Sequence, residues 1–443
     1  MAATLTLTSA VEAINYGGDT AQMIIVFSAT GSGDTPYTFA AKGLRVSDWG
    51  KLKWVYDFDD ALLSPGEYTA TVQDSISYLS DLFFDSTMVA WAKTAQVTIK
   101  INGTIEFIGT VQTDSIEADQ GEQTVTFTCD SQTDILYKQN LWVCADVQGE
   151  GIYGDPVNPF GYTDGVYYPI TTLLEDIFQL VDPTITYPTD LIVFQDWDFR
   201  GWGHWPAKTE EHTGGILFTE LQMYPGPLYF RGTGQYNVGE VLKRLAQGFC
   251  CFTGLVHKKK AFFKKLFYYN ASNLQTLGRV LNRKFGYKYP TIDFFQTIIR
   301  DMGLPYPHWE FGQNTNVEGR CLQKDHYAYF VYKPGDWPNT YTQILAVHGG
   351  YTWYITQCKD NNLASPIWTD SGNQVAKFWW EMRNNLAKCR IDEITVAGLG
   401  YGGVSYDFLK DFNDDGRKYQ PVSMEKDIAN SMTTIEAIYL GEV

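Results

Sequence analysis

An acidic stretch near the C-terminus comes nearest to a metal-binding pattern. Residues 411–416 read Asp-Phe-Asn-Asp-Asp-Gly and match the first half of a calcium-binding loop. The twelfth position of such a loop requires a bidentate glutamate, but here that position is Val422. The motif is incomplete, so a solvated, Asp-rich β-turn that ends in the glycine it needs is the favoured interpretation.

Signatures of catalysis are missing from the sequence. It contains no H-E-x-x-H, G-x-S-x-G or Walker lysine motif, and no G-x-G-x-x-G between a strand pattern and a helix pattern. The histidines are dispersed and lack metal-ligand spacing: His204, His212, His257, His308, His326 and His348. We therefore expect a protein that is not an enzyme and that has no catalytic residue, no metal site and no cofactor.

A tryptophan-rich segment could bind sugars. Trp197, Trp202 and Trp205 follow or flank the acidic residues Asp196 and Asp198, a composition that would suit a sugar-stacking cleft with paired carboxylates. Aromatic loops also pack into subunit interfaces, and this is the favoured interpretation. A carbohydrate-binding or glycan-cleaving adsorption protein remains the alternative function.

Five lysines gather within eight residues of this acidic chain: Lys258, Lys259, Lys260, Lys264 and Lys265. One interpretation is a solvated hairpin that its lysines keep away from neighbouring strand edges. The sharper interpretation is a surface that docks onto an acidic partner, including another copy of this chain. Nucleic acid is the third choice.

Composition narrows the class of protein. The net charge of −17 argues against high-affinity binding of free nucleic acid. The high aromatic content, with 29 Tyr, 26 Phe and 13 Trp, favours β-structure over a helical bundle. The seven cysteines cannot all pair within one chain, which indicates free thiols and folding in a reducing cytoplasm. We also expect a soluble chain without stable membrane association, since no signal peptide or long apolar run is present.

Alternating apolar residues predict strands over most of the first 140 residues. The expected strands are residues 21–27, 37–41, 52–58 and 68–72, with a short helix or a loop at 75–84. Residues 96–131 predict a three-stranded antiparallel meander with one buried face, which turns at Asn102-Gly103.

Helical spacing of apolar residues appears later in the chain. The expected helices are residues 172–181, 237–248, 291–303 and 375–388. A hairpin with its tip at residues 257–260 follows the second of them.

Part of the meander recurs near the C-terminus. Residues 103–107, 115–119 and 124–127 resemble residues 416–419, 423–427 and 433–437. Both series run from a turn glycine to an aromatic residue, then to Ser-x-Glu-x-Asp, then to a Thr-rich strand. Internal duplication and a chance likeness of two short meanders both fit this pattern.

We expect an α+β, mainly β fold in which two β-modules flank an α/β middle region. The expected division is an N-terminal β-module at 1–140, an α/β region with aromatic loops and a helix-hairpin unit at 141–286, a loop-rich helical/β insertion at 287–370, and the C-terminal part of the second module at 371–443.

Several of these segments together resemble bacteriophage tail hub proteins, the baseplate hub or tail-tip hub family. They are residues 105–119, 125–129 and 134–136, residues 238–249 with the hairpin that follows, and residues 416–423. The aromatic stretches at 149–230 and 308–368 depart from the family pattern.

The resemblance implies two tail-tube-like antiparallel β-barrel or sandwich modules per chain and a homotrimer that forms a pseudo-six-fold ring. It implies a distal tail protein or tail tube above the ring, and a spike, fibre or tape-measure protein below it. DNA would pass through only in transit, during ejection after host attachment. The implied location is the virion tail tip or baseplate, after assembly in the host bacterial cytoplasm.

Overall fold

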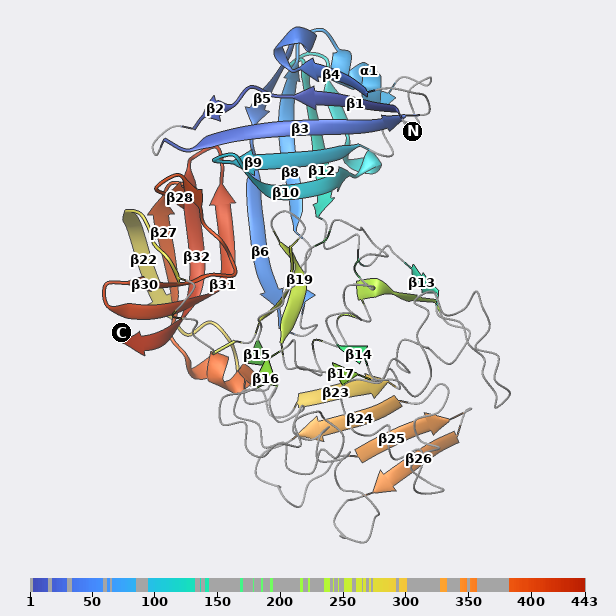
Figure 1. Cartoon of the computed structure of the whole chain (residues 1–443), viewed down its shortest axis with the longest axis vertical. Helices are drawn as coiled ribbons and strands as arrows, with labels where there is room; N and C mark the ends of the chain where they lie inside the picture. The colour runs from blue at the N-terminus through green and yellow to red at the C-terminus, as the bar shows by residue number, and fades with distance from the viewer. Residues whose placement is uncertain are drawn as a thin grey trace.

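A computed structural model places most of the described strands in two curled β-sheets (Figure 1). It describes residues 3–14, 18–29, 34–58, 66–84, 95–131, 251–256, 260–264, 274–291 and 382–442, together with shorter segments. Most of these shorter segments are further strands, whose bounds are given below. Within these residues each of the two sheets has ten strands. The mainly β fold expected from the sequence is confirmed.

The N-terminal sheet has the strand order β4-β1-β3-β9-β10-β12-β8-β5, with β2 paired to β3 and β11 paired to β12. Its strands are β1 (Ala3–Thr8), β2 (Glu12–Ala13), β3 (Thr20–Ala29), β4 (Asp34–Thr38), β5 (Leu44–Asp48), β8 (Glu67–Asp74), β9 (Gln96–Ile101), β10 (Thr104–Val111), β11 (Glu117–Asp119) and β12 (Thr124–Ser131). The helix α1 (Tyr78–Phe84) and the 3-10 turns η1 (Ala40–Lys42) and η2 (Thr113–Ser115) connect them.

The C-terminal sheet has the order β20-β19-β7-β6-β31-β32-β27-β22, with β30 paired to β31 and β21 paired to β30. Its strands are β6 (Lys51–Asp57), β7 (Leu62–Leu63), β19 (Phe252–Val256), β20 (Lys260–Lys264), β21 (Leu274–Gln275), β22 (Val280–Gly286), β27 (Ile391–Ala397), β30 (Asp411–Asp414), β31 (Arg417–Asp427) and β32 (Met432–Glu442). This sheet therefore includes two strands, β6 and β7, that come from the N-terminal part of the chain.

The remaining described strands form separate two-stranded pairs. They are β13 (Asn140–Trp142) with β18 (Gln235–Asn237), β14 (Tyr168–Pro169) with β17 (Gln222–Met223), β15 (Ile192–Val193) with β16 (Ile216–Leu217), β23 (Phe295–Arg300) with β24 (Tyr327–Tyr332), β25 (Gln343–His348) with β26 (Tyr351–Thr356), and β28 (Gly400–Tyr401) with β29 (Val404–Ser405).

Most of the strands expected in the first 140 residues are present because their side chains alternate between core and solvent. The strand expected at 37–41 is wrong beyond Thr38, where β4 ends and η1 begins, with the Thr38 hydroxyl accepting from the backbone N–H of Ala41. In β9 the buried residues Val97, Ile99 and Ile101 alternate with partly exposed neighbours, and β12 buries Val125 and Phe127 in the same way. The expected meander is confirmed as the neighbouring strands β9, β10 and β12.

The two halves of the described chain repeat one arrangement of strands. The order β9-β10-β12-β8-β5 in the N-terminal sheet corresponds to β30-β31-β32-β27-β22 in the C-terminal sheet, and each of these neighbouring pairs is antiparallel. In the N-terminal sheet β10 and β11 both pair with β12, so together they occupy the place of the single long strand β31.

Turn geometry supports the same equivalence. The hairpin before β10 turns at Asn102-Gly103 with φ of 51° and 74°, and the hairpin before β31 turns at Asp415-Gly416 with φ of 51° and 73°. Positive φ at both central residues defines a type I′ turn, in which glycine at the second position is favoured.

The turn before each final strand also matches. Asp119 and Asp427 each accept backbone N–H bonds through Oδ1, from Gly121 and from Asn430 among others, at 2.7 and 3.0 Å. Four residues follow each aspartate before the last strand begins at Thr124 or Met432. The Ser-x-Glu-x-Asp segments are therefore equivalent, whereas the final strands align one residue earlier in the second copy than the sequence comparison suggested.

One expected helix is wrong. Residues 295–300, within the helix expected at 291–303, form β23 and pair antiparallel with β24. The adjacent β-branched residues Thr297, Ile298 and Ile299 favour a strand, and their apolar spacing fits either structure, so pairing with β24 decides the outcome.

The other expected helices are confirmed only where the structure describes them. Val238, Leu242 and Ala246 are helical and buried, and residues 382–388 are helical. Phe178 is helical and buried, while the rest of the helix expected at 172–181 lies outside the described residues. No helix among the described residues is long and apolar enough to cross a membrane.

Candidate functional site: the joint between the two sheets

The chain leaves the N-terminal sheet at a two-residue connection. β5 ends at Asp48 and β6 begins at Lys51 in the other sheet, so only Trp49 and Gly50 lie between them. Gly50 has a φ of 61°, and a Cβ atom there would lie 1.9 Å from the carbonyl oxygen of Thr69. Only glycine allows the chain to turn this tightly against β8.

β6 then becomes a full member of the C-terminal sheet. It pairs antiparallel with the second half of β31, from Lys51 opposite Asp427 to Val55 opposite Ser423. Figure 1 shows β6 running from the N-terminal sheet to a position between β31 and β19. The chain therefore links the two sheets through Trp49 and Gly50, and main-chain pairing with β31 fixes the strand that follows.

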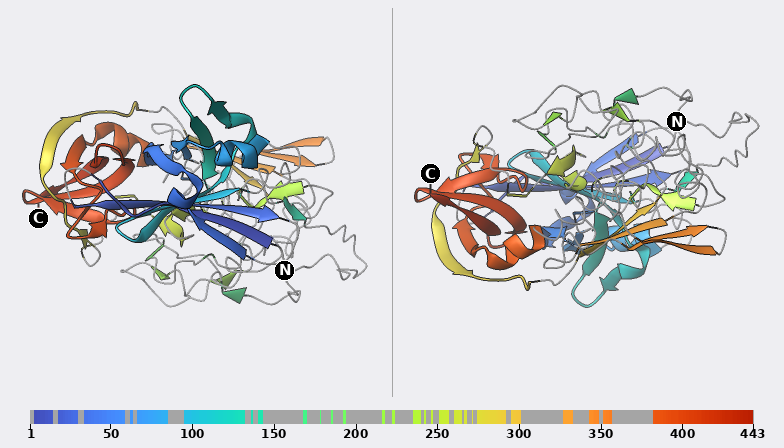
Figure 2. Two further views of the ribbon diagram at one scale, coloured as in Figure 1. Left: turned by 90° about the horizontal axis from the view of Figure 1, so that it is seen from above. Right: turned by 90° about the horizontal axis from the view of Figure 1, so that it is seen from below.

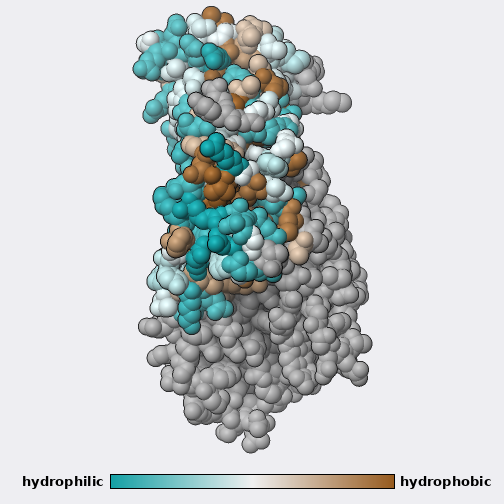
Figure 3. Space-filling view, turned by 90° about the vertical axis from the view of Figure 1, so that its left-hand side faces the viewer, coloured by the Kyte–Doolittle hydropathy of each residue, from teal (hydrophilic) through white to brown (hydrophobic). Residues whose placement is uncertain are grey.

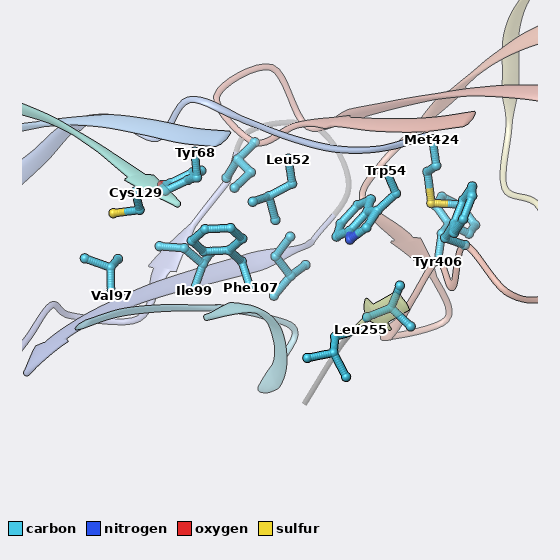
Figure 4. Close-up of a cluster of buried hydrophobic side chains, with 14 of the residues drawn as sticks. Leu52, Trp54, Tyr68, Val97, Ile99, Phe107, Cys129, Leu255, Tyr406 and Met424 are labelled. Carbon is cyan, nitrogen blue, oxygen red and sulfur yellow. The ribbon is translucent and has the colours of Figure 1, made fainter. Parts of the chain in front are cut away.

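The inward side of β6 fills the space between the sheets with apolar side chains. Leu52, Trp54 and Tyr56 alternate with more exposed neighbours and are 1%, 7% and 2% exposed. Figure 4 shows Leu52 and Trp54 lying between Tyr68 and Phe107 of the N-terminal sheet and Met424 of the C-terminal sheet. The hydrophobic core is consequently continuous across the joint.

A buried ion pair crosses the joint. The Lys426 ammonium on β31 lies 2.7 Å from the Glu106 carboxylate on β10, and both side chains are almost fully buried. The ammonium also donates to Ser405 Oγ and to the carbonyl oxygen of Tyr406, at 2.7 and 2.6 Å. Three acceptors therefore satisfy the three N–H groups of a lysine in a dry site, as a buried charge requires.

Glu106 turns inward because the strand is irregular at this point. The register of β10 against β9 shifts between Ile105 and Phe107, which is a β-bulge that contains Glu106. A bulge adds one residue and changes the direction of its side chain. The irregularity places a carboxylate where regular alternation would not.

Asp19 forms a second polar link between the sheets. Its Oδ2 accepts from the backbone N–H of Leu399 at 2.6 Å and from Ser431 Oγ at 3.2 Å, both in the C-terminal half. Its Oδ1 accepts from Asn102 Nδ2 at 2.7 Å, in the N-terminal sheet. This buried carboxylate therefore holds the β9-β10 turn against the last turn of the C-terminal sheet.

Lys51 adds an exposed ion pair at the rim of the joint. Its ammonium lies 2.9 Å from Glu425 and 3.6 Å from Asp427, the second and third named residues of the Ser-x-Glu-x-Asp repeat. The hydrogen bond to Glu425 is the main cause that raises the pKa of Lys51 above its ordinary value.

Burial also raises the pKa of two groups near the joint. Removal from water raises the pKa of the Tyr56 hydroxyl well above its usual range, and the Asp411 and Asp407 carboxylates add to this rise. Burial raises the pKa of the Cys129 thiol as well. Both groups are neutral at physiological pH, which suits structural roles and not nucleophilic ones.

The structure describes only some of the residues that were expected to bind partners. Lys264 is described, and its ammonium is 2.9 Å from Asp411 and 2.7 Å from the carbonyl oxygen of Leu409. Only 13% of its side chain is exposed, so Lys264 stabilises its own chain and does not belong to an open basic surface. Lys260 lies on β20, whereas Lys258, Lys259 and Lys265 and the tryptophans Trp197, Trp202 and Trp205 lie outside the described residues.

The acidic stretch at residues 411–416 forms the hairpin between β30 and β31, as the β-turn interpretation expected. It is less solvated than expected, because Asp411 pairs with Lys264 and Asp414 pairs with Arg283. Among the described residues, no group of three or more histidine, cysteine, aspartate or glutamate side chains could hold a metal ion.

Sequence reasoning missed the three buried charged residues at the joint, Asp19, Glu106 and Lys426. The position of Lys426 could have indicated its burial. It follows Met424 on the buried side of β31, where alternation predicts an apolar residue. The arrangement binds two β-modules together by a shared strand, a shared core and two polar links. These contacts hold the two modules of one chain together.

Three comparisons with known proteins gave different outcomes. No protein-family model matches the sequence, and no curated protein matches it. The solved structures that match include three tail proteins, two of them described as prophage proteins.

One is the 43 kDa tail protein of prophage MuSo2 from Shewanella oneidensis, with a TM-score of 0.45 and 11% identity over 90% of this chain and 97% of that one. A tail protein from Neisseria meningitidis MC58 has a TM-score of 0.42 and 9% identity over 89% and 95% of the two chains. Prophage tail protein gp18 from Listeria monocytogenes EGD-e has a TM-score of 0.34 and 10% identity over 88% of each chain.

Proposed function

We propose that this chain is a structural hub protein at the distal end of a bacteriophage tail. Three copies would form a ring of six similar β-modules, which would match a six-fold tail tube on one side and a three-fold spike or fibre on the other. The proposal involves no catalytic step and no cofactor.

The observation that carries the proposal is the head-to-tail joint between two equivalent modules. One module gives β6 to the edge of the next, and the β9-β10-β12-β8-β5 arrangement returns as β30-β31-β32-β27-β22. Contacts that repeat head to tail close into a ring when the rotation between units allows it. The joint also supplies the rigidity that a wall needs, since main-chain pairing and a continuous core cross it.

The acidic composition supports a channel that DNA crosses without adhering. At a net charge of −17, a ring of three chains would repel the phosphate backbone wherever carboxylates face the channel. The partners in this proposal are a tail tube or distal tail protein above, and a spike, fibre or tape-measure protein below. The location is the virion tail tip or baseplate, after assembly in the host cytoplasm.

The first test is the mass of the purified chain by light scattering, with negative-stain images of the same sample. The expected result is a ring of about 150 kDa, three times the 50.2 kDa chain. A particle that remains a compact monomer at every concentration, alone and together with its neighbouring tail proteins, would contradict the ring.

A further inference from the structure

The two equivalent modules differ at one strand edge. In the C-terminal sheet, β30 pairs with the first half of β31 and β6 pairs with the second half, on the same side. In the N-terminal sheet, β9 pairs with β10, but no described strand pairs with the outer edge of β11. β11 is the equivalent of the β31 segment that receives β6, so the place that β6 fills in one module has no occupant among the described strands in the other.

The open edge is acidic in the same pattern as the filled one. All three residues of β11 are exposed, and Glu117 and Asp119 occupy the positions of Glu425 and Asp427. In the filled joint, those two acids face Lys51 of the incoming strand. A strand that carries lysines would therefore suit the β11 edge.

β22 is the last described strand at the far side of the C-terminal sheet, and it carries exposed apolar side chains. Phe285 pairs with the buried Asp392 and so projects from the face of the sheet that forms the core, yet it is 68% exposed. Tyr287, two residues further, is 77% exposed. Arg390 lies over the Phe285 ring at 4.5 Å but leaves most of it open.

Figure 2 shows the segment that contains β22 along the outer side of the C-terminal sheet. Figure 3 turns that side of the molecule toward the viewer and shows hydrophobic groups among a mainly hydrophilic surface. In the intrachain joint the side chains on the core face are covered: Leu52, Trp54 and Tyr56 of β6 are buried there. Phe285 and Tyr287 have no such cover, and exposed apolar side chains of this kind mark a candidate contact surface.

The same edge carries lysines. Lys284 and Lys288 pair with Glu393 and Glu436 of their own sheet, but 68% and 48% of their side chains remain exposed. Their charge is opposite to that of the β11 edge, where Glu122 in the following turn adds a third exposed carboxylate.

We propose that the β22 edge of one copy docks against the β11 edge of a second copy of this chain. The contact would cover the β11 edge as β6 covers the equivalent edge of β31, although β22, the equivalent of β5, stays paired with β27 in its own sheet. The contact rests on the proposed ring. Because the two edges differ, the contact is heterologous: each copy offers β22 on one side and β11 on the other.

Cysteine cross-linking between two kinds of variant chain tests the pairing. One preparation carries Phe285→Cys, the other carries Ala118→Cys, and a short bismaleimide is added to each alone and to the mixture. A heterologous contact predicts a covalent dimer in the mixture and at most the wild-type background in either variant alone. Ile76→Cys, at a residue 62% exposed, replaces Phe285→Cys as the control and should give no dimer above background.

Charge reversal provides an independent measurement. Lys284→Glu with Lys288→Glu should weaken self-association about tenfold, because like charges would face each other across the contact. Adding Glu117→Lys and Glu122→Lys to the same chain should restore it, whereas Arg45→Glu on β5 should leave it unchanged. Failure of the second pair to restore association would overturn the pairing of these edges.

The outcomes separate this inference from the proposed function. A three-chain ring together with the mixed cross-link supports both. A three-chain ring whose mixed cross-link is missing overturns the β22-β11 contact and leaves the ring standing. A mixed cross-link in a particle that stops at two chains supports the contact and overturns the ring, and a monomer without any cross-link overturns both.

Discussion

The second half of β31 and the short strand β11 are equivalent edges in two different states. The β31 edge holds β6, and around it the molecule has a continuous core, a buried lysine and a buried aspartate. The β11 edge, in the described part of the chain, carries no strand, and all of its residues are exposed. The comparison shows that the N-terminal module gives a strand and the C-terminal module receives it, whereas the equivalent receiving edge of the N-terminal module carries no described strand.

The largest expected effect is at the ion pair of the filled joint. Lys426→Met removes the cation that faces Glu106 in a buried site, and we expect a loss of about 3–5 kcal/mol in the free energy of unfolding. Hydrogen exchange of the β6 and β31 amides, with the β8 and β12 amides as an internal reference, would locate the loss at the joint.

The matched control removes both charges. Lys426→Met with Glu106→Leu should recover most of the lost stability, since no isolated charge then stays buried. Unchanged exchange in the Lys426→Met variant would show that the ion pair does not hold the sheets together.

A smaller loss is expected at the connection that lets β6 leave its own sheet. Gly50→Ala combines a left-handed backbone with a clash against Thr69, and we expect a loss of about 2–4 kcal/mol. Gly103→Ala is the matched control, because Gly103 also has positive φ but nothing lies within 4 Å of the added Cβ atom. Urea unfolding of both variants should show the larger shift for Gly50→Ala, and equal shifts would contradict the role of the close approach.

Loss of the buried Asp19 carboxylate, the second polar link between the sheets, should lower the stability by less. Asp19→Ala leaves the buried N–H of Leu399 without this acceptor, and we expect a loss of about 1–3 kcal/mol. Asp119→Ala also removes a carboxylate that accepts backbone N–H bonds, but at an exposed turn where water replaces it. Urea unfolding that shows an equal or larger loss for Asp119→Ala would argue against a link between the sheets through Asp19.

The smallest effect is expected at the exposed rim of the joint. Lys51→Met should cost about 0.2–1 kcal/mol at neutral pH, since surface ion pairs contribute little. The pKa of Lys51 is raised in the folded chain, so its contribution is fully present below the unfolded value of about 10.4 and is lost as pH rises through the folded value.

Urea unfolding of wild type and Lys51→Met at pH 7 and at strongly alkaline pH checks this sign. The difference between the two proteins should shrink at the higher pH, while Lys53→Met on the same face of β6 serves as the control. A difference that grows with pH would contradict the ion-pair origin of the effect.

Much of the N-terminal sheet could be predicted because its strands carry the alternation of a half-buried surface. Val97, Ile99 and Ile101 predict their strand and its buried side, and Asn102-Gly103 predicts the turn that φ values of 51° and 74° confirm. The recurrence of Ser-x-Glu-x-Asp left internal duplication and a chance likeness both open, and the matching turns after Asp119 and Asp427 favour duplication. These features are local, so the sequence carries them in neighbouring residues.

The joint could not be predicted in the same way. Alternation in residues 51–57 predicts a strand but does not say which sheet it joins, and β6 pairs with β31 more than 360 positions later in the chain. The helix expected at 291–303 fails for a related reason, because pairing with β24 decides a pattern that fits both structures. Lys264 looks like a surface lysine in the sequence, yet it meets the buried carboxylate of Asp411.

The sequence by itself determined the mainly β class, the positions of β3, β8, β9, β10 and β12 in the N-terminal sheet, and the tight turn at Asn102-Gly103. Each of these depends on side-chain alternation or on the φ preference of a few adjacent residues. Only the tertiary structure decided that β6 leaves its own sheet, that Glu106 and Lys426 meet in the core, and which of two equivalent edges receives a strand. Those outcomes depend on main-chain groups and charges that are distant in sequence, and they form only when the two sheets pack together.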